Sequence, residues 1–199
     1  MATRNRCPLC GSTKVRVESP TRYPYEHCGL SDVVLQGPGV VRITHCEKCG
    51  NVTTQIRGEQ QLLQVMGLGL LLRPPGMRGE ELRFLRTLYG MTQAALATAL
   101  GLPRRETVAE WEARDRIFAN VREEIAARLP LLHLFRSRIL ESDHCVLLDS
   151  HVQAYEKFVE SFVDYAGRVL EQGEPAPHPA GFEVRLKQRR RWSPELLPS

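Results

Sequence analysis

The stretch THCEKCGN, residues 44–51, sets two cysteines around a two-residue spacer and follows them with a glycine. A shorter copy of this pattern, RCPLCGS, stands at residues 6–12. In each copy the spacer lets a turn bring two thiolates to one side of a metal ion, and the glycine accepts the tight backbone after the second sulfur. The two copies together therefore predict one metal site shared by both turns.

The predicted ligands are the four cysteines of these turns, Cys7, Cys10, Cys46 and Cys49, around one structural Zn²⁺. Zinc takes four thiolates in a tetrahedron, and such a site has no open position for a catalytic water. Residues 11–45 separate the two pairs, a gap that strands and a loop can fill. Two redox dithiols are the alternative, but they would be sought near a β-α-β pattern, which the sequence lacks.

The remaining cysteines and their histidine neighbours do not complete a second site. Cys28 follows His27, and His45 precedes the second cysteine pair. A second ion held by Cys28, His27 and His45 would need one more ligand, which the sequence does not offer. We therefore interpret Cys28 as a buried or loop thiol and the two histidines as ordinary polar residues. Cys145 is interpreted as a packed thiol. Because no cysteine is assigned a catalytic role and the zinc site is closed, we expect a protein that is not an enzyme.

Composition indicates a soluble, folded protein, because 42% of the 199 residues are hydrophobic and 25% are charged. The longest apolar run, LLQVMGLGLLL at residues 62–72, is about half the length that crosses a bilayer, so we expect no membrane span. No apolar segment follows the charged start, MATRNRCPLC. We therefore expect no signal peptide and a cytoplasmic location, where thiols stay reduced. The net charge of +4 permits nucleic-acid binding without requiring it.

The predicted secondary structure changes along the chain, from strand-like runs to a proline-marked break and then to helices. Strand-like runs occur at Lys14–Glu18, Asp32–Gln36, Val40–Thr44 and Asn51–Arg57. We therefore expect residues 1–57 to form a zinc-binding β domain. Residues 58–77 are assigned to a linker, in which a short helix or strand leads to the proline-marked break RPPG at residues 73–76.

Residues 78–140 carry apolar residues at three- and four-residue steps, which is typical of helices. Gly90 and Gly101 mark helix ends, and Thr92 is a good N-cap for the segment between them. A third helix is expected from Arg104 to about Glu112. Two short helices joined by a glycine-containing turn form a helix-turn-helix, and a plain helical bundle is the alternative.

Residues 141–182 are assigned to a helical extension and residues 183–199 to a basic tail. Within the extension, residues 152–170 predict an amphipathic helix with a partly heptad-like stripe. That helix would form a dimer interface or pack on its own domain, and the sequence leaves both open. The tail, with KQRRRW at residues 187–192, would contact a phosphate backbone or remain a solvated end.

A family resemblance adds to these patterns. The segment from Arg86 to Glu112, with GMTQAALATALGL followed by TVAEWE, resembles helix-turn-helix domains of the Xre or Cro-repressor type. Combined with CPLCG, CEKCG and VVLQGPGVVRITHCEKCGN, it resembles the YgiT-type zinc-finger proteins over roughly residues 5–125. The expected fold is α+β and multidomain: a small four-cysteine, zinc-ribbon-like β domain, then an all-α Xre/Cro-type helix-turn-helix domain with a helical C-terminal extension.

The resemblance implies a DNA-binding transcriptional regulator. It would act as a homodimer on an operator in double-stranded DNA and could be the antitoxin of a toxin–antitoxin pair, with a toxin-like protein partner on the zinc domain. Carried over to this chain, Gln93 would hold a phosphate. The outward face of the third helix would approach phosphates or base edges through four residues: Arg104, Arg105, Thr107 and Ala109. Val108 and Trp111 would face the core.

The chain departs from the family pattern at the third helix. One residue more than usual separates Gly101 from the Trp111–Glu112 pair. Four carboxylates also lie in this region, and carboxylates facing phosphates oppose binding: Glu106, Glu110, Glu112 and Asp115. They motivate the alternative function, a protein-interaction adaptor that keeps the helix-turn-helix as a scaffold without operator binding.

Overall fold

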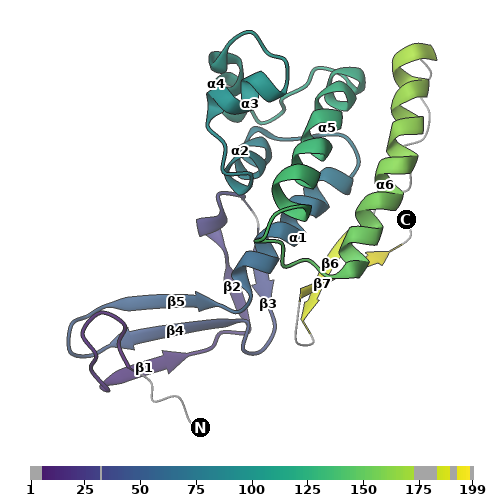
Figure 1. Ribbon diagram of the computed structural model, residues 1–199. Helices are drawn as coiled ribbons and strands as arrows, with labels where there is room; N and C mark the ends of the chain where they lie inside the picture. The colour runs from purple at the N-terminus through teal and green to yellow at the C-terminus, as the bar shows by residue number, and fades with distance from the viewer. Residues whose placement is uncertain (1–5, 32, 173–182, 189–191, 198–199) are drawn as a thin grey trace. The chain divides into compact units, whose positions relative to one another are not determined.

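The structure is a computed structural model and describes residues 6–31, 33–172, 183–188 and 192–197. The chain forms two compact units (Figure 1). The β unit comprises Met1–His27 and Ser31–Glu59, and the helical unit comprises Cys28–Leu30 and Gln60–Ser199. The architecture is therefore mixed: strands lie between residues 15 and 56 and again between residues 183 and 197, and the α-helices lie between them.

The β unit contains a three-stranded antiparallel sheet in the order β1-β4-β5. Its strands are β1 (Val15–Glu18), β4 (Val41–Cys46) and β5 (Val52–Ile56). Val15 lies opposite Cys46 in the first pairing, and His45 lies opposite Val52 in the second. The CEKCG turn therefore connects β4 to β5, and β1 follows the first cysteine pair.

A second, two-stranded sheet joins β2 (Arg22–Pro24) to β3 (Val34–Gln36), with the 3-10 turn η1 (Glu26–Cys28) between them. The predicted runs correspond to β1, β3, β4 and β5, although Asp32 of the second run lies outside the described residues. β2 was not predicted, because three residues that include a proline show no alternation. The core of this unit is small and includes Tyr25, Leu35, Val40 and Val41.

Helix α1 (Glu59–Leu72) occupies most of the segment that was assigned to a linker. Leu62, Val65 and Leu71 are fully buried, so α1 is a core helix. Its apolar residues surround the helix axis, and a pattern without a polar face does not separate a helix from a strand, which is why the sequence left both open. A Cβ on Gly67 would lie 2.4 Å from Leu88 Cδ2, so this glycine permits a close approach to the next helix.

Three short helices follow, α2 (Gly79–Leu88), α3 (Gln93–Ala99) and α4 (Arg105–Glu112). The hydroxyl of Thr92 accepts a hydrogen bond from the Ala95 amide at 3.2 Å, which confirms the predicted N-cap. Gly90 and Gly101 have φ of 65° and 67°, which ends α2 and α3 where the sequence predicted.

Helix α5 (Val121–Phe135) continues into the π turn η2 (Arg136–Leu140), and α6 (Asp149–Gly167) continues into η3 (Arg168–Gln172). None of the described helices combines the length and apolarity needed to cross a membrane. In the predicted basic tail, β6 (Glu183–Gln188) pairs with β7 (Trp192–Leu197). Residues 173–182, 189–191 and 198–199 of the extension and tail lie outside the described residues.

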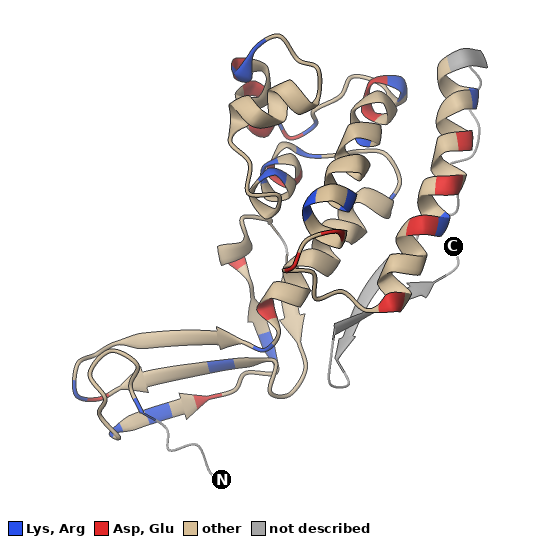
Figure 2. Ribbon diagram, viewed as in Figure 1, with Lys and Arg blue, Asp and Glu red and all other residues tan. Residues whose placement is uncertain are grey.

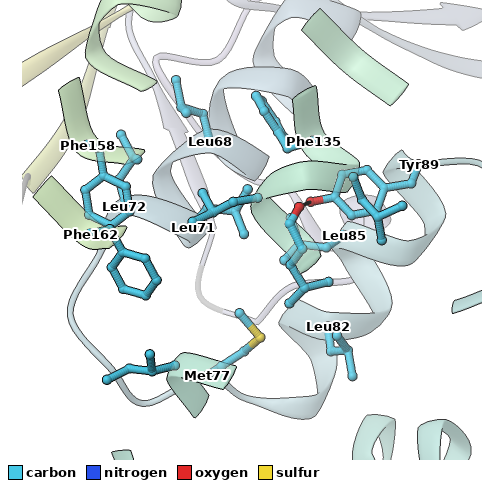
Figure 3. Close-up of a cluster of buried hydrophobic side chains, with 14 of the residues drawn as sticks. Leu68, Leu71, Leu72, Met77, Leu82, Leu85, Tyr89, Phe135, Phe158 and Phe162 are labelled. Carbon is cyan, nitrogen blue, oxygen red and sulfur yellow. Dashed lines mark hydrogen bonds between the residues drawn. The ribbon is translucent and has the colours of Figure 1, made fainter. Parts of the chain in front are cut away.

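One hydrophobic core includes residues of all six helices from α1 to α6. Figure 3 shows the part of this core that α1, α2, α5 and α6 form. Leu68 and Leu71 of α1 lie among residues of α2, α5 and α6. Phe158 and Phe162, on the buried face of α6, stack with ring centroids 5.2 Å apart. The predicted extension therefore packs on the helical unit itself, which accounts for the apolar stripe of α6.

Candidate functional site

The two cysteine turns have the same backbone hydrogen bonds. In the first, the amide of Cys7 donates to the Ser12 carbonyl at 2.8 Å and the amide of Gly11 donates to the Cys7 carbonyl at 2.9 Å. In the second, Cys46 and Gly50 repeat this pattern at 2.8 and 2.9 Å. Gly11 and Gly50 have φ of 69° and 70°, a conformation that favours glycine and explains its place in both motifs.

The turns bring the four predicted ligands into one group. Cys7 Sγ lies 3.7 Å from Cys49 Sγ, Cys10 Sγ lies 3.6 Å from Cys46 Sγ, and all four sulfurs lie within 4.8 Å of one another. A tetrahedral ion with metal–sulfur bonds of about 2.3 Å would hold its sulfurs about 3.8 Å apart. The cysteines are free thiols, so this group can hold a metal ion.

Backbone amides favour ionisation of the first sulfur in each turn. A hydrogen bond from the amide of Cys10 lowers the pKa of Cys7 to about 6, and the amide of Cys49 lowers the pKa of Cys46. The amide of Asn51 acts in the same direction on Cys49, but the neighbouring thiols outweigh it and raise the pKa of Cys49 to about 12. Full ionisation of so close a group needs a cation to neutralise it.

The other candidate ligands lie apart from this group. Among the described residues, the four cysteines are the one set of three or more His, Cys, Asp or Glu whose ligand atoms are close enough to share an ion. His45 Nε2 lies 3.7 Å from a carboxylate oxygen of Glu18, and the Cys28 thiol contacts the Leu30 carbonyl at 4.0 Å.

Helix α4 has an outward face and an inward face. Arg104, its N-cap, and Arg105 and Ala109 are exposed, and Thr107 is half-buried. Val108 is fully buried. On the same inward side the half-buried Trp111 packs edge-on against Phe118, with ring centroids 5.2 Å apart. Arg104, Arg105 and Ala109 are therefore outward and Val108 is inward, as the sequence predicted, whereas Thr107 and Trp111, one helical turn apart, are both half-buried.

Glu112, at the end of α4, points inward and is only 4% exposed. Its carboxylate accepts hydrogen bonds from Arg86 Nε at 2.5 Å and Arg86 Nη2 at 3.2 Å. Burial raises the pKa of Glu112, but the hydrogen bonds from Arg86 and Gln93 outweigh burial and leave the pKa below its ordinary value. The sequence did not reveal this role of Arg86, because Arg86 and Glu112 lie far apart in the chain.

Gln93, the predicted phosphate contact, forms a hydrogen bond with the carboxylate of Glu112. Its Nε2 donates to Glu112 Oε2 at 2.9 Å. An amide nitrogen carries two donors, so one N–H of Gln93 remains for another acceptor. The structure therefore gives Gln93 a supporting contact that the sequence did not predict.

The acidic residues of α4 are partly neutralised within the protein. Glu106 pairs with Arg105 at 3.1 Å, and Glu110 pairs with Arg114 at 3.7 Å. Figure 2 accordingly colours both basic and acidic positions on the ribbon of α4. With Glu112 turned inward, Asp115 is the member of the predicted acidic set that has no ion pair among the described residues.

Comparison of the chain with protein-family models, with curated proteins and with solved structures gives no match. The assignment of a function therefore depends on the cysteine group and on the outward face of α4.

Proposed function

We propose that the protein is a DNA-binding transcriptional regulator in which α3 and α4 form a helix-turn-helix and the four cysteines hold one structural Zn²⁺. The observation that carries the proposal is the division of α4. Arg104 and Arg105 lie on its exposed side, whereas Val108 and Glu112 anchor the opposite side. A helix supported in this way presents its N-terminal residues to the major groove.

The residues at the start of α4 have the right chemistry for that role. Arginine pairs with guanine through two hydrogen bonds, and it also neutralises phosphates. The exposed Ala109 continues the outward face and the half-buried Thr107 borders it, so a methyl group and a hydroxyl can contact base edges. The Arg105–Glu106 pair is exposed, so its small stabilisation is easily exchanged for a phosphate contact.

The identity of the metal follows from its ligands. Four thiolates at tetrahedral spacing suit zinc, and no ligand position remains for a water. The small core of the β unit makes a structural ion valuable, because metal binding then contributes directly to folding. The proposed zinc therefore holds the β unit in shape and performs no chemistry.

A regulator of this kind would bind a palindromic operator as a homodimer, and its β unit would be free to bind a protein partner. An antitoxin that represses its own operon, with a toxin-like partner on the zinc domain, fits this arrangement. The competing function is a protein-interaction adaptor without operator binding. The mixed charges of α4 favour it, because Glu106 and Glu110 remain exposed beside their arginines.

Binding of the metal-loaded protein to the DNA upstream of its own gene separates the two functions. The fragment is compared with unrelated DNA at two salt concentrations. Arg104→Ala/Arg105→Ala should lose the preference for the upstream fragment, whereas Arg138→Ala, an exposed arginine beyond α5, should keep it. Equal, weak binding of both fragments by the unaltered protein would support the adaptor.

A further inference from the structure

Strand β5 forms one edge of the three-stranded sheet (Figure 1). Among the residues that the structure describes, no backbone group pairs with its outer side. An edge of this kind is a template for another strand, and proteins usually protect it with charged residues, proline or a covering segment. The opposite edge, β1, carries Arg16 and Glu18, whereas the five residues of β5, Val-Thr-Thr-Gln-Ile, include no charge and no proline.

The hydrogen bonds at the two ends of β5 show which backbone groups face outward. The Arg57 amide donates to the Val40 carbonyl at 3.0 Å, and the Asn51 carbonyl accepts from the Cys46 amide at 2.8 Å. Residues that bond to the same neighbour alternate along an antiparallel strand. Thr53 and Gln55 therefore also bond to β4, and the N–H and C=O groups of Val52, Thr54 and Ile56 point away from the sheet.

We propose that β5 pairs in antiparallel fashion with β5 of a second copy of this chain, about a two-fold axis at Thr54. In this register Thr54 lies opposite Thr54 of the second copy, and Val52 lies opposite Ile56. All three outward residues fall in hydrogen-bonded pairs, so every free backbone group of the edge gains a partner. The two sheets join into one continuous sheet.

The side chains are complementary in the same register. Val52 is 56% exposed, and pairing covers it with Ile56 of the second copy. Pairs of β-branched residues across strands stabilise a sheet. On the other face, Thr53 lies opposite Gln55, so two polar side chains that can hydrogen-bond meet.

The flanking charges do not oppose this pairing. Arg57 lies opposite Asn51 of the second copy, which is neutral. The two copies of Arg57 lie at opposite ends of the paired strands, about 20 Å apart at 3.3 Å per residue. That separation exceeds the screening length at physiological salt.

Hydrogen exchange tests the register directly and without DNA, so its outcome is independent of the proposed regulatory function. The amides of Val52, Thr54 and Ile56 should exchange fast at low protein concentration and slowly at high concentration. The amides of Thr53 and Gln55, bonded to β4, should exchange slowly at both. Sedimentation over the same range should show the matching change from monomer to dimer. A chain that stays monomeric throughout, or a dimer in which the outward amides still exchange fast, would overturn the proposal.

Thr54→Pro is the sharpest variant, because proline removes an N–H that β4 does not use. It should raise the dimer dissociation constant at least about tenfold, while Thr54→Val, which keeps the N–H, should leave dimerisation intact. Metal content and circular dichroism report whether Thr54→Pro folds. If it does not fold, Val52→Lys replaces it, since a lysine there puts a charge against Ile56 of the second copy. Unchanged dimerisation in the folded variant contradicts pairing through β5.

Discussion

Arg86 of α2 holds the carboxylate of Glu112 at the end of α4, with its Nε 2.5 Å from Glu112 Oε1. The guanidinium is mostly covered and the carboxylate is almost completely buried, so the contact is shielded from water. Gln93 of α3 donates to the same carboxylate. One acidic side chain therefore fixes the three short helices in their relative positions.

Loss of Arg86 should destabilise the helical unit strongly. Arg86→Ala leaves a buried carboxylate with weaker partners, and breaking a buried pair in this way costs about 3 kcal/mol or more. Arg83→Ala is the matched control, because Arg83 is 55% exposed and lies 3.7 Å from the same carboxylate, so its loss should cost less than about 1 kcal/mol. Chemical denaturation, monitored by circular dichroism, measures the unfolding free energy of both variants. Equal losses of unfolding free energy would refute the special role of Arg86.

Acid should remove the contribution of Glu112. Its pKa in the folded protein is below the ordinary value of 4.5, so its stabilising effect is present above about pH 4.5 and is lost as the pH falls through the folded value. The difference in unfolding free energy between the unaltered protein and Glu112→Gln should therefore be large near neutral pH and shrink below about pH 4.5. A difference that does not change with pH would show that the charge of Glu112 contributes nothing.

Local signals in the sequence explain which parts of the structure were predictable. The end of α2 and both ends of α3 follow from Gly90, Thr92 and Gly101, whose effects act within one turn of the chain. Each cysteine pair follows from its spacing, because each turn positions its own two sulfurs, and the pairing of β1 with β4, which sets Val15 opposite Cys46, brings the two pairs together. Helix α1 was assigned to a linker because its role depends on tertiary packing, which a run of apolar residues does not specify.

The orientation of charged residues was harder to predict. Counting carboxylates on the third helix treats every one as exposed, whereas Glu112 turns inward to a partner 26 positions earlier. Arg128 on α5 is also buried and lies 2.7 Å from Glu124, a partner one helical turn earlier that the helix itself brings near. Arg128 also donates to the Pro74 carbonyl at 3.1 Å and so secures the proline-marked break. Long-range partners such as Arg86 with Glu112, or Arg128 with the Pro74 carbonyl, meet only after the chain has folded.

Removal of the metal should unfold the β unit and spare the helical unit. Cys10→Ser eliminates one of four sulfurs, and binding of a structural zinc is worth about 10–16 kcal/mol in zinc-finger peptides. Metal analysis should find one ion in the unaltered protein and in Cys145→Ser, whose sulfur lies outside the group, but none in Cys10→Ser. The helical circular dichroism signal should persist in all three proteins, because the helical unit has its own core. A Cys10→Ser protein that keeps its ion would exclude the four-cysteine site.

Gly79, the first residue of α2, packs directly on the backbone that ends α4. Its amide donates to the Arg114 carbonyl at 2.9 Å, and a Cβ at this position would lie 2.4 Å from the Trp111 carbonyl oxygen. Gly79→Ala therefore forces two backbone segments apart, which should lower the unfolding free energy by about 1–3 kcal/mol.

The matched control is Gly167→Ala near the end of α6, where a Cβ meets nothing within 4 Å and a helical alanine should add up to about 1 kcal/mol. Denaturation midpoints of the two variants measure the contrast. Because Gly79→Ala displaces the end of α4, it should also weaken the proposed operator binding, although the residue itself is buried. Equal stability of the two variants would show that the contact between α2 and α4 is loose enough to accept a methyl group.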